Sequence, residues 1–333
     1  MTSNLKNTDI RKILVISLSN IGDVILTFPV LDILRTDFSM AEISIVVGPK
    51  AEPLFKDNPC FNSIFVFDKH QPFLKTLHFL RQLRADHYDL IVDLRNTAIP
   101  FFIGSRHRTS FVDRKNNIPM RLKHLNRLKT VYAYSAEPKA EPKEKYCLVI
   151  SEKDRVYIDR LLAEEIGGFK KIIVVAPGAA NGDKRWTQKG FQEICDYLVK
   201  KGADIIFVGD QNDGESAQGI QKLMREHSLN LCGRLTLIQL AELCKRSALV
   251  VSNDSAPMHL ASYLDCPVLA IFGPTDPQKY GPWSKKSYFL RKNETCLKCQ
   301  NKKLTVPHAC MEAVHSEDVI KILNLIQNDE TRV

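Results

Sequence analysis

The chain has 333 residues, enough for two domains, and its 44% hydrophobic and 26% charged residues are typical of a soluble globular protein. No apolar run approaches the roughly 18 residues of a membrane span, and the polar start at residues 1–11 lacks the apolar core of a secretory signal, so we expect a cytoplasmic protein. The net charge of +9 fits either an anionic partner or a solvated basic surface. No nucleic-acid-binding motif accompanies it, so we expect no nucleic-acid partner.

The first part of the chain alternates short apolar runs with helical patterns. Residues 12–18 form a β-branched run that predicts a strand buried on both faces, as in a parallel sheet. A helical pattern follows over residues 24–34, so Gly22 and Asp23 lie at the start of that helix. Further strands are predicted at 43–47, 64–67 and 89–93, and a helix at 72–85. This alternation predicts right-handed crossovers between parallel strands.

Between residues 95 and 145 the periodicity weakens and basic side chains gather. They are Arg95, Arg106, His107, Arg108, Arg114, Lys115, Arg121, Lys123, His124, Arg127 and Lys129. Pro138 and Pro142 indicate an excursion before the chain returns at 146–150 and enters a helix at 152–165. The Gly167-Gly168 pair is the best candidate for a hinge between domains.

The pattern then starts again. Strands are predicted at 171–176, 203–208, 248–252 and 267–272, and helices at 187–200, 210–227 and 316–327, with a capping box at 236–239 opening one more. The chain is therefore expected to be an α/β protein with two Rossmann-like domains and parallel sheets. We predict a first domain at 1–166, a second at 167–315, and a C-terminal helix at 316–333 that packs back on the first domain.

Ligands of such sheets bind beyond the carboxyl ends of the strands. The segments that follow the predicted strands are 19–23, 95–96, 178–186, 209–215, 253–259 and 273–276, and we expect them to line one cleft between the domains. Residues 250–259 are the most informative, because a strand, a turn and a helix start meet there. The free amides and the dipole of a helix start attract an anion, and Asp254, Ser255 and His259 bracket this one. His259 is equally well explained as a packed core histidine.

Three further charged residues each fit both a functional and a structural role. Asp23 is either a general base or a carboxylate that complements a helix dipole, and its position alone favours the second. Lys184, beside Arg185 and Trp186, either neutralises a phosphate leaving group or is a solvated charge. An acidic residue near 215 fits a ribose-binding role, for which Asp210, Asp213 and Glu215 compete.

The nine cysteines are scattered and odd in number, so no disulfide framework is expected. Cys296-x-x-Cys299, His308 and Cys310 are four candidate metal ligands, but the His-x-Cys half lacks a common zinc spacing, and we favour a loop of free thiols without metal. No phosphate-binding Gly-x4-Gly-Lys, Gly-x-Gly-x-x-Gly, Gly-x-Ser-x-Gly or His-Glu-x-x-His motif is present, which argues against the corresponding enzyme classes.

Four stretches resemble glycosyltransferase family 9, the bacterial ADP-heptose:lipopolysaccharide heptosyltransferases. They are Ile-Ser-Leu-Ser-Asn-Ile-Gly-Asp-Val-Ile-Leu-Thr-Phe-Pro at 16–29, Pro-Gly-Ala-Ala-Asn-Gly-Asp-Lys-Arg-Trp at 177–186, Asn-Asp-Ser-Ala-Pro-Met-His at 253–259, and Phe-Gly-Pro-Thr-Asp-Pro at 272–277. They occur in the family's order and cover nearly the whole chain. The cysteine stretch near 296–310 also resembles a loop of some members.

The resemblance implies a GT-B fold and inverting, metal-independent transfer, without a cofactor, from an ADP-sugar such as ADP-heptose. The acceptor implied is an anionic, lipid-linked glycan at the inner membrane face. Asp23 matches the family's proposed base, and Lys184 matches the lysine at the donor phosphates. The implied donor-binding residues are Gly178, Ala179, Ala180, Lys184, Glu215, Leu235, Asp254, Ser255, Ala256 and His259. For the acceptor, the basic stretch 95–129 contains no motif that the resemblance can transfer, and we expect Asn20, Gly22, Arg95 and Arg106 to bind it.

Two departures from the family's motifs concern the identity of the donor sugar. Ala179 and Ala180 stand where members often carry Thr or Ser, and Asn-Asp-Ser-Ala-Pro replaces the Asp-Thr-Gly of the best-studied type. These differences leave the exact donor sugar open while keeping the class. A nucleotide-sugar epimerase on the same fold and a non-catalytic nucleotide-sugar binding protein remain as alternatives. Asp23 and Lys184 together argue against the second of these.

Overall fold

The computed structural model describes residues 9–18, 20–110, 118–133, 147–167, 171–292, 296–301, 305 and 308–330. The chain forms two compact units, Met1–Val149 and Ile150–Val333. None of the helices in the described part of the chain combines the length and apolar character needed to cross a membrane.

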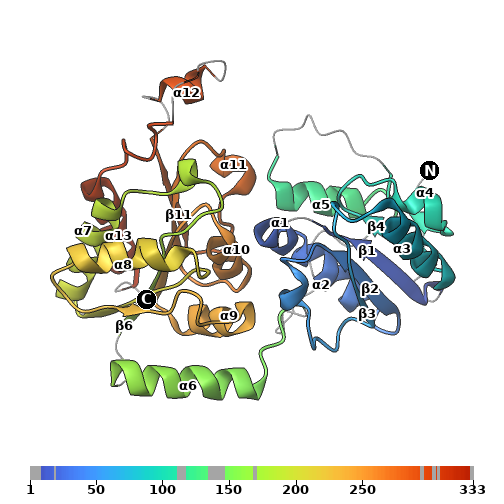
Figure 1. Ribbon diagram of the computed structural model, residues 1–333, viewed down its shortest axis with the longest axis horizontal. Coiled ribbons are helices and arrows are strands. Elements are labelled where there is room, and N and C mark those ends of the chain that lie inside the picture. Colours follow the sequence, from blue (N-terminus) through green and yellow to red (C-terminus); the bar gives the residue numbers. More distant parts are fainter. Residues whose placement is uncertain are drawn as a thin grey trace. The chain divides into compact units, whose positions relative to one another are not determined.

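The first unit is built on a five-stranded parallel sheet with the order β3-β2-β1-β4-β5 (Figure 1). Its strands are β1 (Lys12–Ile16), β2 (Glu42–Val47), β3 (Ser63–Val66), β4 (Leu90–Asp93) and β5 (His107–Arg108). The central strands β1 and β4 are buried almost throughout, which confirms the prediction of strands covered on both faces. The two-residue strand β5 lies in the basic stretch and was not predicted.

The helices of the first unit are α1 (Ile21–Ile25), α2 (Phe28–Asp37), α3 (Phe73–Ala85), α4 (Ile99–Ile103) and α5 (Met120–Leu128), with a short 3-10 turn at Glu52–Leu54. The single helix predicted over 24–34 is two helices. Pro29, which has no amide hydrogen, lies in the first turn of α2, where no intrahelical donor is needed. The buried Thr27 hydroxyl, which lies between α1 and α2, donates to the carbonyl oxygen of Val24 and bonds to the Ser17 hydroxyl. These bonds hold the junction of the two helices against the end of β1.

The second unit contains a six-stranded parallel sheet with the order β11-β10-β9-β6-β7-β8. Its strands are β6 (Lys171–Ala176), β7 (Ala203–Phe207), β8 (Leu229–Asn230), β9 (Leu249–Asn253), β10 (Val268–Phe272) and β11 (Ser287–Arg291). In both units the strand order reverses beside the first strand, between β1 and β4 and between β6 and β9. Ligands of doubly wound sheets bind at this switch point, so the loops after these four strands are the ones to inspect.

The helices of the second unit are α6 (Glu152–Ile166), α7 (Gln188–Lys200), α8 (Asp213–Leu223), α9 (Leu237–Arg246), α10 (Ala256–Tyr263), α11 (Pro277–Tyr280), α12 (Leu297–Gln300) and α13 (Ser316–Glu330), with a 3-10 turn at Gly182–Lys184. The predicted capping box is confirmed. The Thr236 hydroxyl accepts from the Gln239 amide at 3.1 Å, and the Gln239 side chain accepts from the Thr236 amide at 3.0 Å.

Two features differ from the predicted domains of 1–166, 167–315 and 316–333. Helix α6 belongs to the second unit, because it packs on α9 and forms the ion pairs Arg234–Glu165 and Arg246–Asp159 with that unit. The boundary therefore lies near residue 150 rather than at the Gly167-Gly168 pair. Helix α13 belongs to the second unit and packs against α7 and β11, because its apolar stripe of Val319, Leu323 and Ile326 completes that unit's core.

Candidate functional site

In the second unit, Asn253 joins the two loops at the switch point. Strands β6 and β9 are neighbours, with Ala176 beside Ser252, so the loops that follow them leave the same edge of the sheet. The Asn253 side chain is fully buried, donates to the carbonyl oxygen of Pro177 at 2.7 Å, and accepts from the Trp186 amide at 3.2 Å. One amide side chain therefore fixes both ends of the 177–186 loop against the end of β9.

This arrangement brings together Lys184 and Asp254, which were predicted separately as donor-binding residues. The Lys184 ammonium lies 2.7 Å from the Asp254 carboxylate, whose side chain is only 5% exposed, whereas the Lys184 side chain is 27% exposed. A nearly buried carboxylate thus holds a lysine that still reaches solvent. The ammonium is fixed at the carboxyl edge of the sheet, where an anionic ligand is expected.

The start of α10 follows immediately. Ser255 is its N-cap residue, but its hydroxyl bonds to the Ser252 hydroxyl at 3.0 Å instead of capping the helix. Ala256 opens the helix with Pro257 in the first turn. The amides of that turn therefore keep their capacity to bind an anion, close in sequence to the Lys184 partner Asp254.

Gly178 is required by a close approach of Asp213. A Cβ atom at residue 178 would lie 2.1 Å from the Asp213 carboxylate, and one at Gly209 would lie 2.6 Å from the Asp213 Cβ. Asp213 accepts from the Asp210 amide at 3.1 Å, and burial raises the pKa of Asp213 while that hydrogen bond opposes the shift. Among the three competing acids, Asp213 is thus engaged in packing the loops after β6 and β7.

The remaining predicted donor residues follow strands of the same sheet, either in loops or near the starts of helices. Ala179 is buried and Ala180 is exposed in the 177–186 loop. Glu215 is exposed in the first turn of α8, after β7, and Leu235 is half-buried just before α9, after β8. The His259 side chain is only 5% exposed and its ring centroid lies 6.0 Å from that of Trp283, which agrees with the packed position left open by the sequence.

In the first unit, Asp23 lies in the first turn of α1, directly beyond β1. Asn20 is the N-cap residue and its carbonyl oxygen accepts from the Val24 amide at 3.1 Å, so the helix start carries Gly22 and Asp23 as predicted. The Asp23 side chain is half-buried, and its carboxylate forms no hydrogen bond or ion pair with any residue that the structure describes. It is therefore available to a ligand.

The loop after β4 is ordered by Asp93. This buried carboxylate accepts from the Arg95 amide at 2.8 Å and from the Thr97 amide at 2.6 Å. Burial raises the pKa of Asp93, while these hydrogen bonds and the Arg127 guanidinium oppose the rise. The turn places Arg95, a predicted acceptor residue, at the carboxyl edge of the first sheet.

A cavity of about 310 Å³ opens beside this turn. Its lining residues are Asp93, Asn96, Thr97, Pro100, Phe101, Arg108, Thr109, Ser110 and Arg127. The Arg108 guanidinium lies 4.5 Å above the Phe101 ring. The pKa of the nearby His124 is lowered to about 3 by burial and by Arg95, Arg127 and Lys123, so His124 is neutral and the positive charge here comes from arginines.

Sequence reasoning did not select the two arginines of this cavity. Arg106, which it did select, is exposed and lies outside the lining, as does Arg95. Arg108 reaches the lining because the short strand β5 pairs with β4 and places Arg108 beside Ile91, a relation that no local sequence pattern shows. Arg127 comes from α5, in the stretch where no helix was predicted.

Comparisons with known proteins agree with this architecture. The model of "Glycosyltransferase family 9 (heptosyltransferase)" matches residues 76–309. Lipooligosaccharide heptosyltransferase 2 of Haemophilus ducreyi is 27% identical over 314 residues, covering 84% of this chain and 88% of that protein. A family 9 glycosyltransferase from Veillonella parvula superposes with a TM-score of 0.84 at 22% identity, covering 99% and 100% of the two chains.

The E. coli ADP-heptose lipopolysaccharide heptosyltransferase II superposes with a TM-score of 0.73 at 22% identity, covering 96% of this chain and 99% of that one. These likenesses and the two parallel sheets confirm the predicted GT-B class. Because the family model spans most of the chain, this protein is a glycosyltransferase that belongs to glycosyltransferase family 9, the heptosyltransferase family.

Proposed function

We propose that the enzyme transfers heptose from ADP-heptose to an anionic, lipid-linked glycan of the lipopolysaccharide core, with inversion at the anomeric carbon and no metal ion in the reaction. The observation that carries the proposal is the Lys184–Asp254 pair beside the start of α10, at the switch point of the second sheet. The names of the Haemophilus ducreyi and E. coli relatives support the sugar and the acceptor class.

In this proposal the second unit binds the donor. The Lys184 ammonium and the amides at Ser255 and Ala256 stabilise the negative charge that develops on the ADP diphosphate as it leaves. This positive charge performs the task that a metal ion has in other nucleotide-sugar enzymes. Gly178, Ala179 and Ala180 line the approach of the phosphates, Glu215 binds the ribose hydroxyls, and Leu235 contacts the adenine, as the family resemblance implies.

The first unit supplies the base. The acceptor hydroxyl oxygen attacks the anomeric carbon from the side opposite the diphosphate, its proton passes to Asp23, and the bond to the diphosphate oxygen breaks to release ADP. One displacement of this kind inverts the configuration. The absence of any ion pair of Asp23 with the described residues supports the role, because a salt-bridged carboxylate is a weaker base. Asn20, Gly22 and Arg95 are the proposed acceptor contacts on the loops after β1 and β4, and Arg106, which is exposed outside the lining of the cavity, is left out of them.

Two surface features support an anionic, lipid-linked acceptor. The cavity carries the Arg108 and Arg127 side chains, which suit phosphate or carboxylate groups of a glycan. Phe101 and Phe102 on α4 are 56% and 60% exposed, and Phe73 and Leu74 on α3, which packs with α4, are 77% and 76% exposed. Exposed aromatic and aliphatic side chains beside basic ones are typical of contact with an anionic lipid surface.

The test is a transfer assay with the acceptor lipid in anionic vesicles. ADP-heptose is compared with ADP-glucose and UDP-sugars, and we expect one heptose added per acceptor, with the anomeric configuration inverted in the NMR spectrum. Pelleting the same vesicles measures the proposed membrane contact. Altered sugar in ADP-heptose without acceptor would indicate the epimerase, and binding without turnover on any glycan would indicate a non-catalytic protein. Either result would contradict the proposal.

The cavity predicts that Arg108 and Arg106, which are separated by one residue, contribute differently to acceptor binding. Arg108→Ala removes a charged side chain from the lining and is expected to raise the KM for the acceptor about 10-fold, the value of one charge-assisted hydrogen bond. Arg106→Ala removes an equally exposed arginine that does not line the cavity, and this matched control should change the acceptor KM little if the cavity binds the anion. The opposite order of the two effects would place the acceptor outside the cavity. Donor KM serves as the internal reference for both variants.

A further inference from the structure

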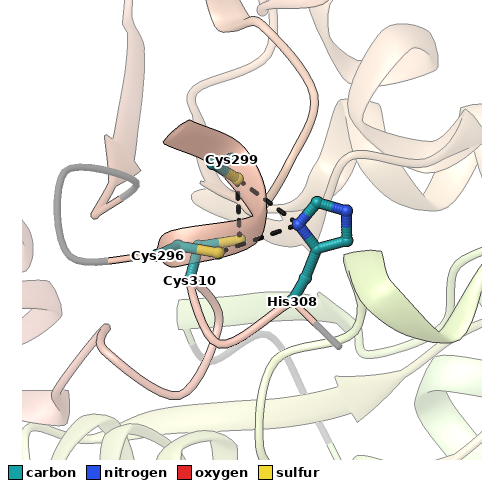
Figure 2. A group of neighbouring side chains, drawn as sticks. All are labelled: Cys296, Cys299, His308 and Cys310. Carbon is teal, nitrogen blue, oxygen red and sulfur yellow. Dashed lines mark hydrogen bonds between the residues drawn. The ribbon is translucent and has the colours of Figure 1, made fainter. Parts of the chain in front are cut away.

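Four side chains with metal-binding atoms converge near the end of the second unit's chain. Figure 2 shows the sulfur atoms of Cys296, Cys299 and Cys310 gathered on the side of His308 that carries Nδ1. One ligand atom from each of the four residues lies within 4.8 Å of all the others. The cluster is distant in sequence from every residue that the proposed transfer reaction uses.

The distances match a tetrahedral ion. Zinc at about 2.3 Å from sulfur and about 2.0 Å from nitrogen sets two sulfur ligands roughly 3.8 Å apart and sulfur and nitrogen ligands roughly 3.6 Å apart. The Cys299 and Cys310 sulfurs are 3.8 Å apart, and His308 Nδ1 lies 3.4 Å from the Cys299 sulfur and 3.8 Å from the Cys296 sulfur. Three of the six distances between the ligand atoms are thus close to those of a tetrahedral site, and the other three are at most 4.8 Å.

The backbone prepares this arrangement. Cys296 is the N-cap residue of helix α12, its carbonyl oxygen accepts from the Cys299 amide at 2.9 Å, and this single turn brings the two sulfurs to one side. The Cys296 sulfur also accepts hydrogen bonds from the backbone amides of Cys299 and Ala309. Amides that donate to a ligand sulfur orient it and stabilise its thiolate form. The uncommon His-x-Cys spacing of His308 and Cys310 is therefore compatible with binding of one metal ion by both side chains.

Neither disulfide bonding nor the packing of free thiols in an apolar core accounts for this geometry. No two of these sulfurs are at the roughly 2.05 Å of a disulfide. Cys195, by contrast, packs singly in the apolar core of the second unit, as a structural free thiol does. Cys296 and Cys310 are 1% and 0% exposed, and their sulfur atoms lie within 4.8 Å of the other two ligand atoms. A metal site built from these residues would replace the loop of free thiols that the sequence favoured.

We propose that Cys296, Cys299, His308 and Cys310 bind one zinc ion in a closed, structural Cys3His site. The three thiols lose their protons on binding, and with four protein ligands no position remains for a substrate. The site ties α12 to residues 308–310, which lead into the core of the second unit. Met311, next to Cys310, packs so closely on Gly273 that a Cβ there would lie 2.8 Å from the Met311 sulfur, and the Trp186 indole donates to the Val314 carbonyl oxygen at 2.8 Å.

The experiment measures metal in the full chain, purified without chelator, under reducing conditions and with no histidine tag. We expect about one zinc per chain by mass spectrometry of the elements, in keeping with four protein ligands. Cys299→Ser should lose this metal and lower the Tm, whereas Cys232→Ser, a half-buried cysteine of the same unit outside the cluster, should retain it. Neither readout depends on the transferase reaction.

A measurement on the unaltered chain covers the case in which Cys299→Ser does not fold. Exchange of the bound ion for Co²⁺ should give the visible absorption of a tetrahedral, sulfur-ligated site. Iron at one per chain would support the site and overturn its assignment to zinc. A chain that contains no metal and gains no Co²⁺ spectrum, or a folded Cys299→Ser chain with unchanged metal content, would overturn the site itself.

Discussion

Asp23→Asn is expected to lower kcat by roughly 10²- to 10⁴-fold, the usual contribution of a positioned general base, and to leave the Kd for ADP-heptose unchanged. Asn keeps the size and polarity of the side chain but cannot take the acceptor proton. The measurement is steady-state transfer together with calorimetric donor binding. Because Asp23 has no ion-pair partner among the described residues, the substitution breaks no salt bridge that would complicate its effect.

The structural alternative for Asp23 is a favourable charge at the start of α1. Glu152→Gln removes the same kind of charge from the first turn of α6, together with an exposed ion pair to Arg155, and is the control, with an expected loss of at most about 1 kcal/mol of stability and no loss of transfer. If Asp23→Asn behaves like this control and turnover survives, the assignment of the base is wrong.

Lys184→Gln is expected to reduce transfer by roughly 10²- to 10³-fold, as the loss of one preorganised donor to a developing negative charge does. It also leaves the nearly buried Asp254 carboxylate without its ion-pair partner, which destabilises the second unit. The single variant therefore combines two effects. Tm and the kcat for ADP-heptose have to be measured together to separate them.

A double-mutant cycle with Asp254→Asn makes the separation. The Lys184→Gln/Asp254→Asn chain has no unpaired buried charge at this pair, so its Tm should recover toward that of the original protein. If Lys184 stabilises the leaving diphosphate, transfer remains low in the double variant. Recovery of transfer together with Tm would mean that Lys184 only partners Asp254, and the proposed role would be lost.

The strands at the centre of both sheets were predictable because burial on both faces demands uninterrupted Val, Ile and Leu. The runs at β1 and β6 show this pattern directly. The two-residue strands β5 and β8 have too few side chains to show any periodicity. Edge strand β11 is only half-buried, so its hydrophobic pattern is diluted by flanking charges. Helix α5 was not predicted, because its polar and basic side chains outnumber its apolar ones and weaken the helical pattern.

The sequence allowed individual residues of the candidate site to be selected, but it did not reveal which of them contact one another. Lys184 and Asp254 are 70 residues apart, and their contact follows from the crossover that puts β9 beside β6, a neighbour relation that local patterns do not encode. Asp213 was weighed only as a ribose ligand, because its packing on Gly178 is a contact between two loops. The cysteine cluster was judged by counting residues along the chain, whereas ligation depends on distance in space.

The attachment of α6 to the second unit determines where this enzyme can be recombined with its relatives. A chimera that exchanges donor halves at residue 167 would separate Arg246 from Asp159 and Arg234 from Glu165, and would leave α9 facing a foreign helix. An exchange at residue 150 carries α6 with its partners and keeps the covering of α9 native. An exchange designed to test the proposed donor-binding role therefore has to carry the sheet of the second unit together with α6.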